Sequence, residues 1–281
     1  MVMYVFQNYL IVFFDILGQR ESLRKITGIP DSKSEQEKQK FLESIQRSVG
    51  KVTKLRGAFK GFFESASRNE EQMVASKSRK EFASSLKENL KFYSLSDATV
   101  ISVPLTDENE NCTAVNGVYS AFTAICAIGL LALAEEIPAR AGLSVGVATQ
   151  IDDHEIYGPA LEMAIHIEKE LAEYPRFLVG KEVLDYLTWV KDQKCKTKCG
   201  EIAKDTSGRC IQMIVQDTDG RFMLDFIGQG IKEALGNRKE FKDVVNAAHS
   251  FVKSQYREYM NKDDKLAFRY FRLLRYMKTG K

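Results

Sequence analysis

Short strand-like segments alternate with helical ones along most of this chain, and their order constrains the fold more than any other feature. The order is a strand, helices, a hairpin, a helix, a strand, a helix, a strand and a second hairpin. It predicts an α+β fold with a ferredoxin-like antiparallel sheet core covered by helices on one face. In that topology the first strand and the first hairpin are neighbours in the sheet.

The hydrophobic pattern places these elements as follows. Strands are expected at residues 9–14, 91–104 (a hairpin with its turn near Leu95-Ser96-Asp97), 141–148, 176–180, 211–215 and 221–226. Helices are expected after Gly18, within 31–90, at 118–136 and 162–172, and from Ile231 to the end. The glycines of the 141–148 strand predict close packing against a neighbour. We therefore expect one domain over residues 1–230 and a helical C-terminal extension over 231–281.

Composition narrows the class of protein. Of the 281 residues, 44% are hydrophobic and 28% charged, as in ordinary globular proteins. A net charge of +3 gives no electrostatic reason to expect a nucleic-acid partner. Five cysteines without a signal peptide favour a reducing, cytoplasmic location. The apolar stretch 118–134 contains Ser120 and Thr123 and ends at Glu135, so a core helix is expected there and no membrane span.

Two carboxylates stand at the edges of expected strands. Asp15 lies in Phe-Phe-Asp-Ile-Leu-Gly, which ends at Gly18, and Asp97 lies in the turn of the first hairpin. In the predicted topology these two side chains meet at one edge of the sheet. Such a pair can hold two divalent metal ions, about 4 Å apart, on a triphosphate. The alternative for each Asp is a helix cap or a turn residue.

Four motifs, in this order, resemble the catalytic domain of class III nucleotidyl cyclases and span about residues 8–180. They are Phe-Phe-Asp-Ile-Leu-Gly (13–18), Ser-Asp (96–97), Arg-Ala-Gly-Leu-Ser-Val-Gly (140–146) and Ile-Tyr-Gly-Pro-Ala-Leu (156–161). More narrowly, the chain resembles the Pycsar-type pyrimidine cyclases of bacterial anti-phage defence. That likeness lies in Tyr157–Leu161, Ala164, Ile167-Glu168 and Tyr174-Pro175-Arg176.

The resemblance implies that a ribose 3′-hydroxyl attacks the α-phosphate of its own nucleoside triphosphate. The products are a 3′,5′-cyclic nucleotide and pyrophosphate. Asp15, Asp97 and the carbonyl of Ile16 would hold two Mg²⁺ or Mn²⁺ ions, since hard cations prefer oxygen ligands. The free backbone N–H groups of the turn Ile16-Leu17-Gly18-Gln19 would bind the β- and γ-phosphates, with Gly18 allowing close approach. The active form would be a homodimer whose sites combine metal ligands of one subunit with base-facing residues of the other.

Alignment to the family places Tyr93 and Glu155 against the base. A bulky Tyr shortens the pocket and favours a pyrimidine, and its hydroxyl can donate or accept a hydrogen bond. Glu155 can accept from uracil N3–H or from the cytosine amino group. We expect UTP to be preferred, with CTP next. The alternatives are an ordinary strand aromatic for Tyr93 and a solvated turn residue for Glu155.

One departure from the family pattern concerns the usual Asn and Arg of the helix, which stabilise ribose and the transition state. Glu162 and His166 occupy those positions here. The substituting cations are left open among Arg140, Arg176 and the C-terminal Arg269, Arg272 and Arg275. The departure supports an alternative, a degenerate cyclase that binds nucleotide as a regulatory or dimerising module. A palm-type polymerase or diguanylate cyclase is disfavoured, because residues 94–97 lack the turn motif of those enzymes.

Overall fold

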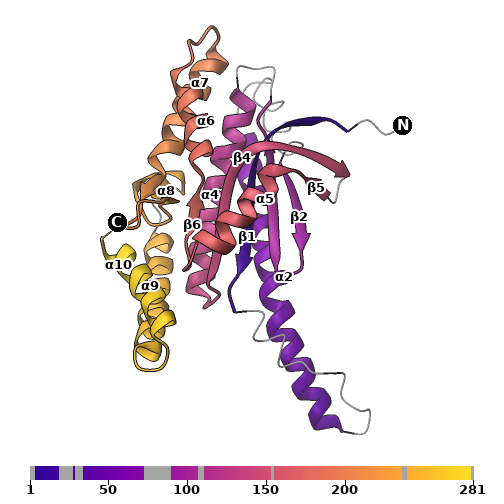
Figure 1. The fold of residues 1–281 in the computed structure, drawn as a ribbon, viewed down its shortest axis with the longest axis vertical. Helices are drawn as coiled ribbons and strands as arrows, with labels where there is room; N and C mark the ends of the chain where they lie inside the picture. Colours follow the sequence, from indigo (N-terminus) through magenta and orange to yellow (C-terminus); the bar gives the residue numbers. More distant parts are fainter. Residues whose placement is uncertain are drawn as a thin grey trace.

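The fold centres on four antiparallel strands, shown in Figure 1. The structure is a computed structural model that describes residues 4–18, 28, 34–72, 90–106, 111–152, 155–235 and 239–279. The strands are β1 (Phe6–Ile16), β2 (Lys91–Leu95), β3 (Ala98–Pro104) and β4 (Ala139–Asp152). Their order is β2-β3-β1-β4, and each neighbouring pair is antiparallel. This is the ferredoxin-like order, which confirms the predicted α+β fold.

Four shorter strands complete the sheet: β5 (Glu155–Tyr157), β6 (Phe177–Val179), β7 (Ile214–Gln216) and β8 (Phe222–Leu224). β5 pairs with the end of β4 and β6 lies parallel to its beginning, both on the edge of β4 opposite β1. β8 and β7 follow antiparallel to β6 and to each other. The sheet therefore extends well beyond the four-stranded core on the β4 side.

One face of the sheet packs against α2 (Glu35–Gln72) and α4 (Cys112–Ala134). α2 contributes Leu55 and Phe59 to the core. The rings of Phe59 and of Phe14 on β1 form a T-shaped pair with their centroids 5.1 Å apart. α4 is buried almost all round, which explains why its sequence is apolar on every side. Within the described residues, α4 is the one helix long and apolar enough to cross a membrane, yet most of it is buried inside this fold.

The opposite face of the sheet is also covered, so the expectation of helices on one face alone was wrong. α5 (Pro159–His166) and the π-helical turn Ile167–Leu171 that continues it pack on β1 and β4. β1 reflects this double cover, since Leu10, Ile11 and Val12 are all fully buried. A continuous apolar run, rather than an alternating one, is the pattern of a strand covered on both faces.

In the described part of the chain after β6 there are five further helices. They are α6 (Lys181–Asp192), α7 (Lys198–Gln212), α8 (Gln229–Ala234), α9 (Lys239–Tyr259) and α10 (Asp264–Thr279). α9 packs on α4 and α10 packs on α9, beside the sheet in Figure 1. The predicted helical C-terminal extension is thus present. The helix expected after Gly18 lies outside the described residues.

A buried ion cluster ties α10 to the sheet. Arg176, which is fully buried, pairs with Asp217 and with Asp219 of the β7–β8 turn. Arg272 of α10 reaches the same two carboxylates at 3.3 and 3.0 Å. Both guanidinium groups also lie over the Tyr174 ring, at 4.5 and 4.8 Å from its centroid. The cluster therefore holds the extension, the hairpin and the segment before β6 together.

Asp219→Asn is expected to lower the free energy of unfolding at pH 7 by about 2 kcal/mol, because charge-assisted hydrogen bonds from two arginines are weakened. Burial alone would raise the pKa of Asp219, but hydrogen bonds from Arg176 and Arg272 outweigh it and lower the pKa. The contribution is therefore full above the ordinary Asp pKa of about 4 and is lost as pH falls towards the folded value.

Denaturant titrations of the wild type and Asp219→Asn across acid pH measure the difference between their free energies of unfolding, here called the gap. It should be largest near neutrality and should close in acid. The control is Asp185→Asn, because Asp185 forms an exposed pair with Lys181 at 3.1 Å, and such pairs contribute less than about 1 kcal/mol. A gap that does not depend on pH would contradict the electrostatic explanation.

Candidate functional site

Asp15 and Asp97 lie next to each other at one end of the sheet. Asp15 is the last residue but one of β1, and its cross-strand partner on β3 is Ala98. Asp97 directly precedes Ala98 in the two-residue turn that joins β2 to β3. Residues directly opposite on paired strands have Cβ atoms about 5 Å apart. The strand register alone therefore brings the two carboxylates to one place.

The turn that carries Asp97 is held from outside. Its first residue, Ser96, has a left-handed backbone with φ of 53°, which is uncommon for a residue with a side chain. Arg56 of α2 donates a hydrogen bond from Nη2 to the Ser96 carbonyl oxygen at 2.5 Å. The long helix thus fixes the position of Asp97 as well as covering the sheet.

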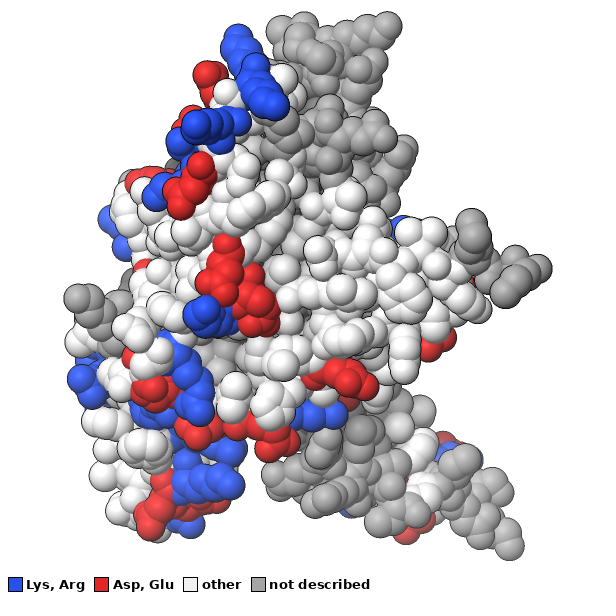
Figure 2. Space-filling model, turned by 45° about the horizontal axis from the view of Figure 1, so that its top comes forward, with Lys and Arg blue, Asp and Glu red and all other residues white. Residues whose placement is uncertain are grey.

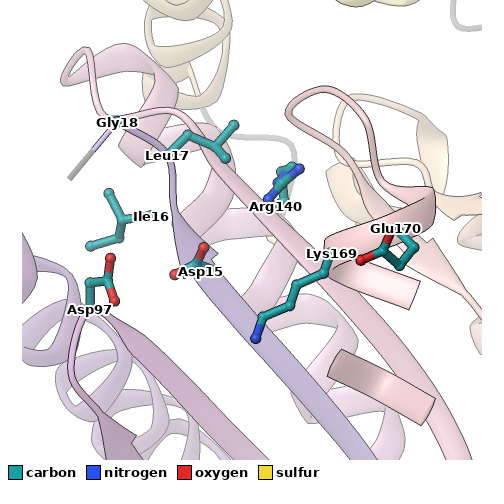
Figure 3. A pocket seen from close by; sticks show the side chains of 8 residues that line it. All are labelled: Asp15, Ile16, Leu17, Gly18, Asp97, Arg140, Lys169 and Glu170. Carbon is teal, nitrogen blue, oxygen red and sulfur yellow. The ribbon is translucent and has the colours of Figure 1, made fainter. Parts of the chain in front are cut away.

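Both carboxylates line one open pocket of about 310 Å³, drawn in Figure 3. Its lining residues are Asp15, Ile16, Leu17, Gly18, Asp97, Arg140, Lys169 and Glu170. In the figure Asp15 lies between Asp97 and Lys169, whose side chain reaches from the π-helical turn towards β1. The structure therefore gathers three carboxylates and two cations around a volume within the range of small-molecule sites.

The two cations of the pocket enter from β4 and the π-helical turn. Arg140 is the cross-strand partner of Asp15 on β4. Lys169 was not anticipated from the sequence, because a π-helical turn changes the register that ordinary helical spacing assumes. Of the other candidate cations, Arg176 and Arg272 belong to the ion cluster described above. Arg140 and Lys169 are thus the cations that line the pocket and could bind phosphate there.

Glu168 forms a buried ion pair behind the pocket. Its side chain is fully buried, and its Oε1 lies 2.6 Å from Nη2 of Arg140. Burial raises the pKa of Glu168; Arg140 opposes this rise and the charge of Asp15 adds to it. Arg140 therefore pairs with the carboxylate of Glu168 on the π-helical turn and has Asp15 as its cross-strand neighbour on β1.

The backbone of residues 16–18 differs from the expected phosphate-binding turn. The Leu17 N–H donates a hydrogen bond to the carbonyl of Pro138 at 2.8 Å, so it is not free to bind a phosphate. Gly18 adopts a left-handed φ of 85° at the pocket rim, a conformation that suits glycine. Gln19 lies outside the described residues. Arg140 and Lys169 are consequently better placed than Leu17 to receive phosphate charge.

The residues expected to face the base do not line this pocket. Tyr93 lies on the same face of the sheet as Asp15, where it is 4% exposed in a cluster with Val100 and Ala98. Glu155 is exposed on β5, at the far end of β4. Glu162 and His166 are exposed on α5. Within one chain these four residues are therefore separate from the two carboxylates.

The pocket suits hard divalent cations. The carboxylates of Asp15 and Asp97 and the carbonyl of Ile16 are oxygen donors, and Mg²⁺ is bound in proteins through one or two carboxylates together with substrate phosphates. In the part of the chain that the structure describes, no three His, Cys, Asp or Glu side chains converge on a single ion position. The donor set therefore fits ions that share their coordination with a phosphorylated substrate.

No protein-family model matches the sequence, and no curated protein does. Among solved structures, the adenylyl cyclase CyaB from P. aeruginosa is 13% identical with a TM-score of 0.42, over 67% of this chain and 84% of that one. A non-canonical dimeric guanylyl cyclase domain of the RhoGC fusion protein from the aquatic fungus Blastocladiella emersonii is 10% identical with a TM-score of 0.39, over 79% of this chain and 96% of that one. Likeness at this level carries no inference about activity, so function rests on the pocket residues.

Proposed function

We propose that this chain is a nucleotidyl cyclase, which converts a nucleoside triphosphate to the 3′,5′-cyclic mononucleotide and pyrophosphate. The observation that carries the proposal is the pairing of Asp15 and Asp97 in one pocket with Arg140 and Lys169. Two carboxylates that can hold divalent ions, beside two cations that can hold phosphate, are what a triphosphate requires. The sequence motifs shared with class III cyclases point to the same reaction.

In this reaction a bond forms between the ribose O3′ and the α-phosphorus, and the bond from that phosphorus to the bridging oxygen of the β-phosphate breaks. Asp15, Asp97 and the Ile16 carbonyl would hold two Mg²⁺ or Mn²⁺ ions. When bound, these ions lower the pKa of the 3′-hydroxyl and neutralise triphosphate charge. Arg140 and Lys169 stabilise the negative charge that moves onto the departing pyrophosphate.

The direct test is incubation of the purified chain with Mn²⁺ and each of the four common nucleoside triphosphates, with products separated by chromatography and identified by mass. We expect a 3′,5′-cyclic mononucleotide and an equal amount of pyrophosphate from at least one substrate. A folded, nucleotide-binding protein that forms no cyclic product from any of them would contradict the proposal.

For the substrate we propose a pyrimidine nucleotide, with UTP ahead of CTP. Tyr93 would shorten the pocket, and its hydroxyl would donate to uracil O4 while Glu155 accepts from N3–H. The burial of Tyr93 in the sheet face suits a residue that limits pocket depth. A site built to hydrogen-bond one base rejects others strongly, because its buried polar groups are then left unpaired. The matching biological role is production of a second messenger in cytoplasmic anti-phage defence.

Tyr93→Ala is expected to deepen the base pocket and to bring the kcat/KM for ATP and GTP closer to that for UTP, by roughly tenfold or more. Phe92→Ala is the matched control, because Phe92 is the neighbouring aromatic on β2 and its ring lies 6.3 Å from Phe59 on the α2 side. Its nucleotide preference should stay that of the wild type. A wild-type protein that prefers ATP or GTP would contradict the proposal that Tyr93 selects a pyrimidine nucleotide.

The active form that we propose is a homodimer, with Tyr93 and Glu155 of one subunit facing Asp15 and Asp97 of the other. Apolar side chains stand exposed around β4, β5 and α5 in the single chain, as a partner surface would require: Val147, Ile151, Tyr157 and Met163. Figure 2 also shows a broad area with few charged side chains. The catalytic unit would lie within residues 1–230, with 231–281 as its extension.

A nucleotide-binding regulatory module is the second candidate. Glu162 and His166 replace the family's transition-state residues, and Glu162 has the wrong charge for a triphosphate. Under this alternative the wild-type protein binds a nucleoside triphosphate in the presence of divalent ions but forms no cyclic product. The incubation above therefore separates the two candidates.

A further inference from the structure

Arg140 has two neighbouring carboxylates, and their surroundings differ. Asp15 is its cross-strand partner and lines the open pocket, whereas Glu168 is fully buried behind it. An arginine beside a metal-binding aspartate competes with the cation for that carboxylate. A second carboxylate gives the guanidinium another anchor, and because Arg has five N–H donors it can keep that anchor while others face the pocket.

The backbone is built to bring Glu168 close to β4. Gly142 is two residues after Arg140, and so on the same face of the strand. A Cβ added at Gly142 would lie 2.1 Å from the Ala164 carbonyl oxygen and 2.7 Å from the Glu168 nitrogen. The helix therefore rests directly on a strand position where only glycine leaves room.

The π-helical turn places neighbouring residues on opposite sides. The Ala172 N–H bonds to the Ile167 carbonyl at 2.9 Å, which is the i to i+5 spacing of a π-helix. Glu168 is directed inward to Arg140, while Lys169 and Glu170 line the pocket. Arg176 donates to the Leu171 carbonyl at 2.9 Å, so the buried ion cluster fixes the end of this turn.

From this geometry we propose that Glu168 is a positioning residue, which holds Arg140 so that its guanidinium faces the triphosphate and leaves Asp15 to the metal ions. The inference rests on the proposed function, since it gives Arg140 a phosphate to bind. It predicts that Glu168 affects nucleotide binding only through Arg140, although Glu168 itself does not reach the pocket.

The test compares Glu168→Gln, Arg140→Ala and the double variant. Binding of UTP in the presence of Ca²⁺ is measured by calorimetry, alongside cyclase turnover and thermal unfolding. Glu168→Gln keeps the shape of the side chain and removes its charge, and we expect roughly tenfold weaker UTP binding. Glu201→Gln, an exposed substitution on α7, is the charge-matched control and should bind as the wild type does.

In the Arg140→Ala background, adding Glu168→Gln should not weaken UTP binding further, because the residue through which Glu168 acts is absent. It should instead raise the unfolding temperature, since Arg140→Ala leaves a buried carboxylate without its cation. Wild-type UTP affinity in a folded Glu168→Gln protein, or additive losses in the double variant, would overturn the inference.

The failure of this inference is distinguishable from that of the proposed function. A wild-type protein that binds UTP without cyclising any nucleotide contradicts the cyclase, while the binding comparison still decides the role of Glu168. A wild-type protein that cyclises UTP, with an unaltered Glu168→Gln variant, contradicts only the role of Glu168. A wild-type protein that binds no nucleoside triphosphate overturns both.

Discussion

Asp97→Asn is expected to fold as the wild type does and to lose at least about 99% of its cyclase activity. The amide keeps the size of the side chain and its place in the β2–β3 turn, which Arg56 holds through the Ser96 carbonyl. It removes the negative charge that a divalent cation requires. Metal-derived stabilisation of transition-state charge is worth several kcal/mol, and each 1.4 kcal/mol is about tenfold in rate.

Initial rates with saturating UTP and Mn²⁺ measure this loss, and thermal unfolding confirms that the variant is folded. The control is Asp243→Asn, an exposed substitution on α9 that removes the same charge far from the sheet edge. It should retain wild-type turnover. Near-normal activity in a folded Asp97→Asn protein would remove Asp97 from the metal site.

Much of the fold can be predicted from local pattern. The β2–β3 hairpin was expected with its turn at residues 95–97 and is found with β2 ending at Leu95 and β3 starting at Ala98. The prediction leaves residues 181–210 without helices, although Val183, Leu187 and Val190 show the i, i+4, i+7 spacing of an amphipathic helix. That signal was available in the sequence.

The cover on the second face of the sheet was harder to predict. A continuous apolar run such as Leu10-Ile11-Val12 indicates that a strand is buried on both faces, but it does not say which segment provides the cover. Gly142 predicted close packing, and the structure shows that the partner is the backbone of α5 and the π-helical turn. The identity of that partner depends on tertiary contacts.

The sequence supported the carboxylate pair better than the rest of the pocket. Asp15 and Asp97 lie at the ends of strands whose pairing follows from the topology, so their meeting is a consequence of strand order. The position of Lys169 in the pocket could not be predicted in this way. Its direction depends on an i to i+5 helical turn, and no residue pattern predicts such a turn. The commitment of the Leu17 N–H to Pro138 likewise depends on a contact between distant segments.

Mixing two inactive variants is expected to restore cyclase activity. In the proposed homodimer, each site takes its metal ligands from one subunit and its base-facing residues from the other. Asp97→Asn destroys the first half, and Glu155→Lys destroys the second by placing a cation where the base needs an acceptor. Glu155 is exposed on β5, so its substitution should not disturb the core.

When the two variants exchange subunits in equal amounts, half of the dimers combine one of each. Such a heterodimer has one site with both defects and one site with neither, so about one quarter of wild-type activity should return. Each variant alone should stay inactive at the same concentration, and mixing Asp97→Asn with Asp15→Asn should restore nothing, because both damage the same half. If labelled subunits are shown to exchange and no activity returns, the metal ligands and base-facing residues do not come from different chains.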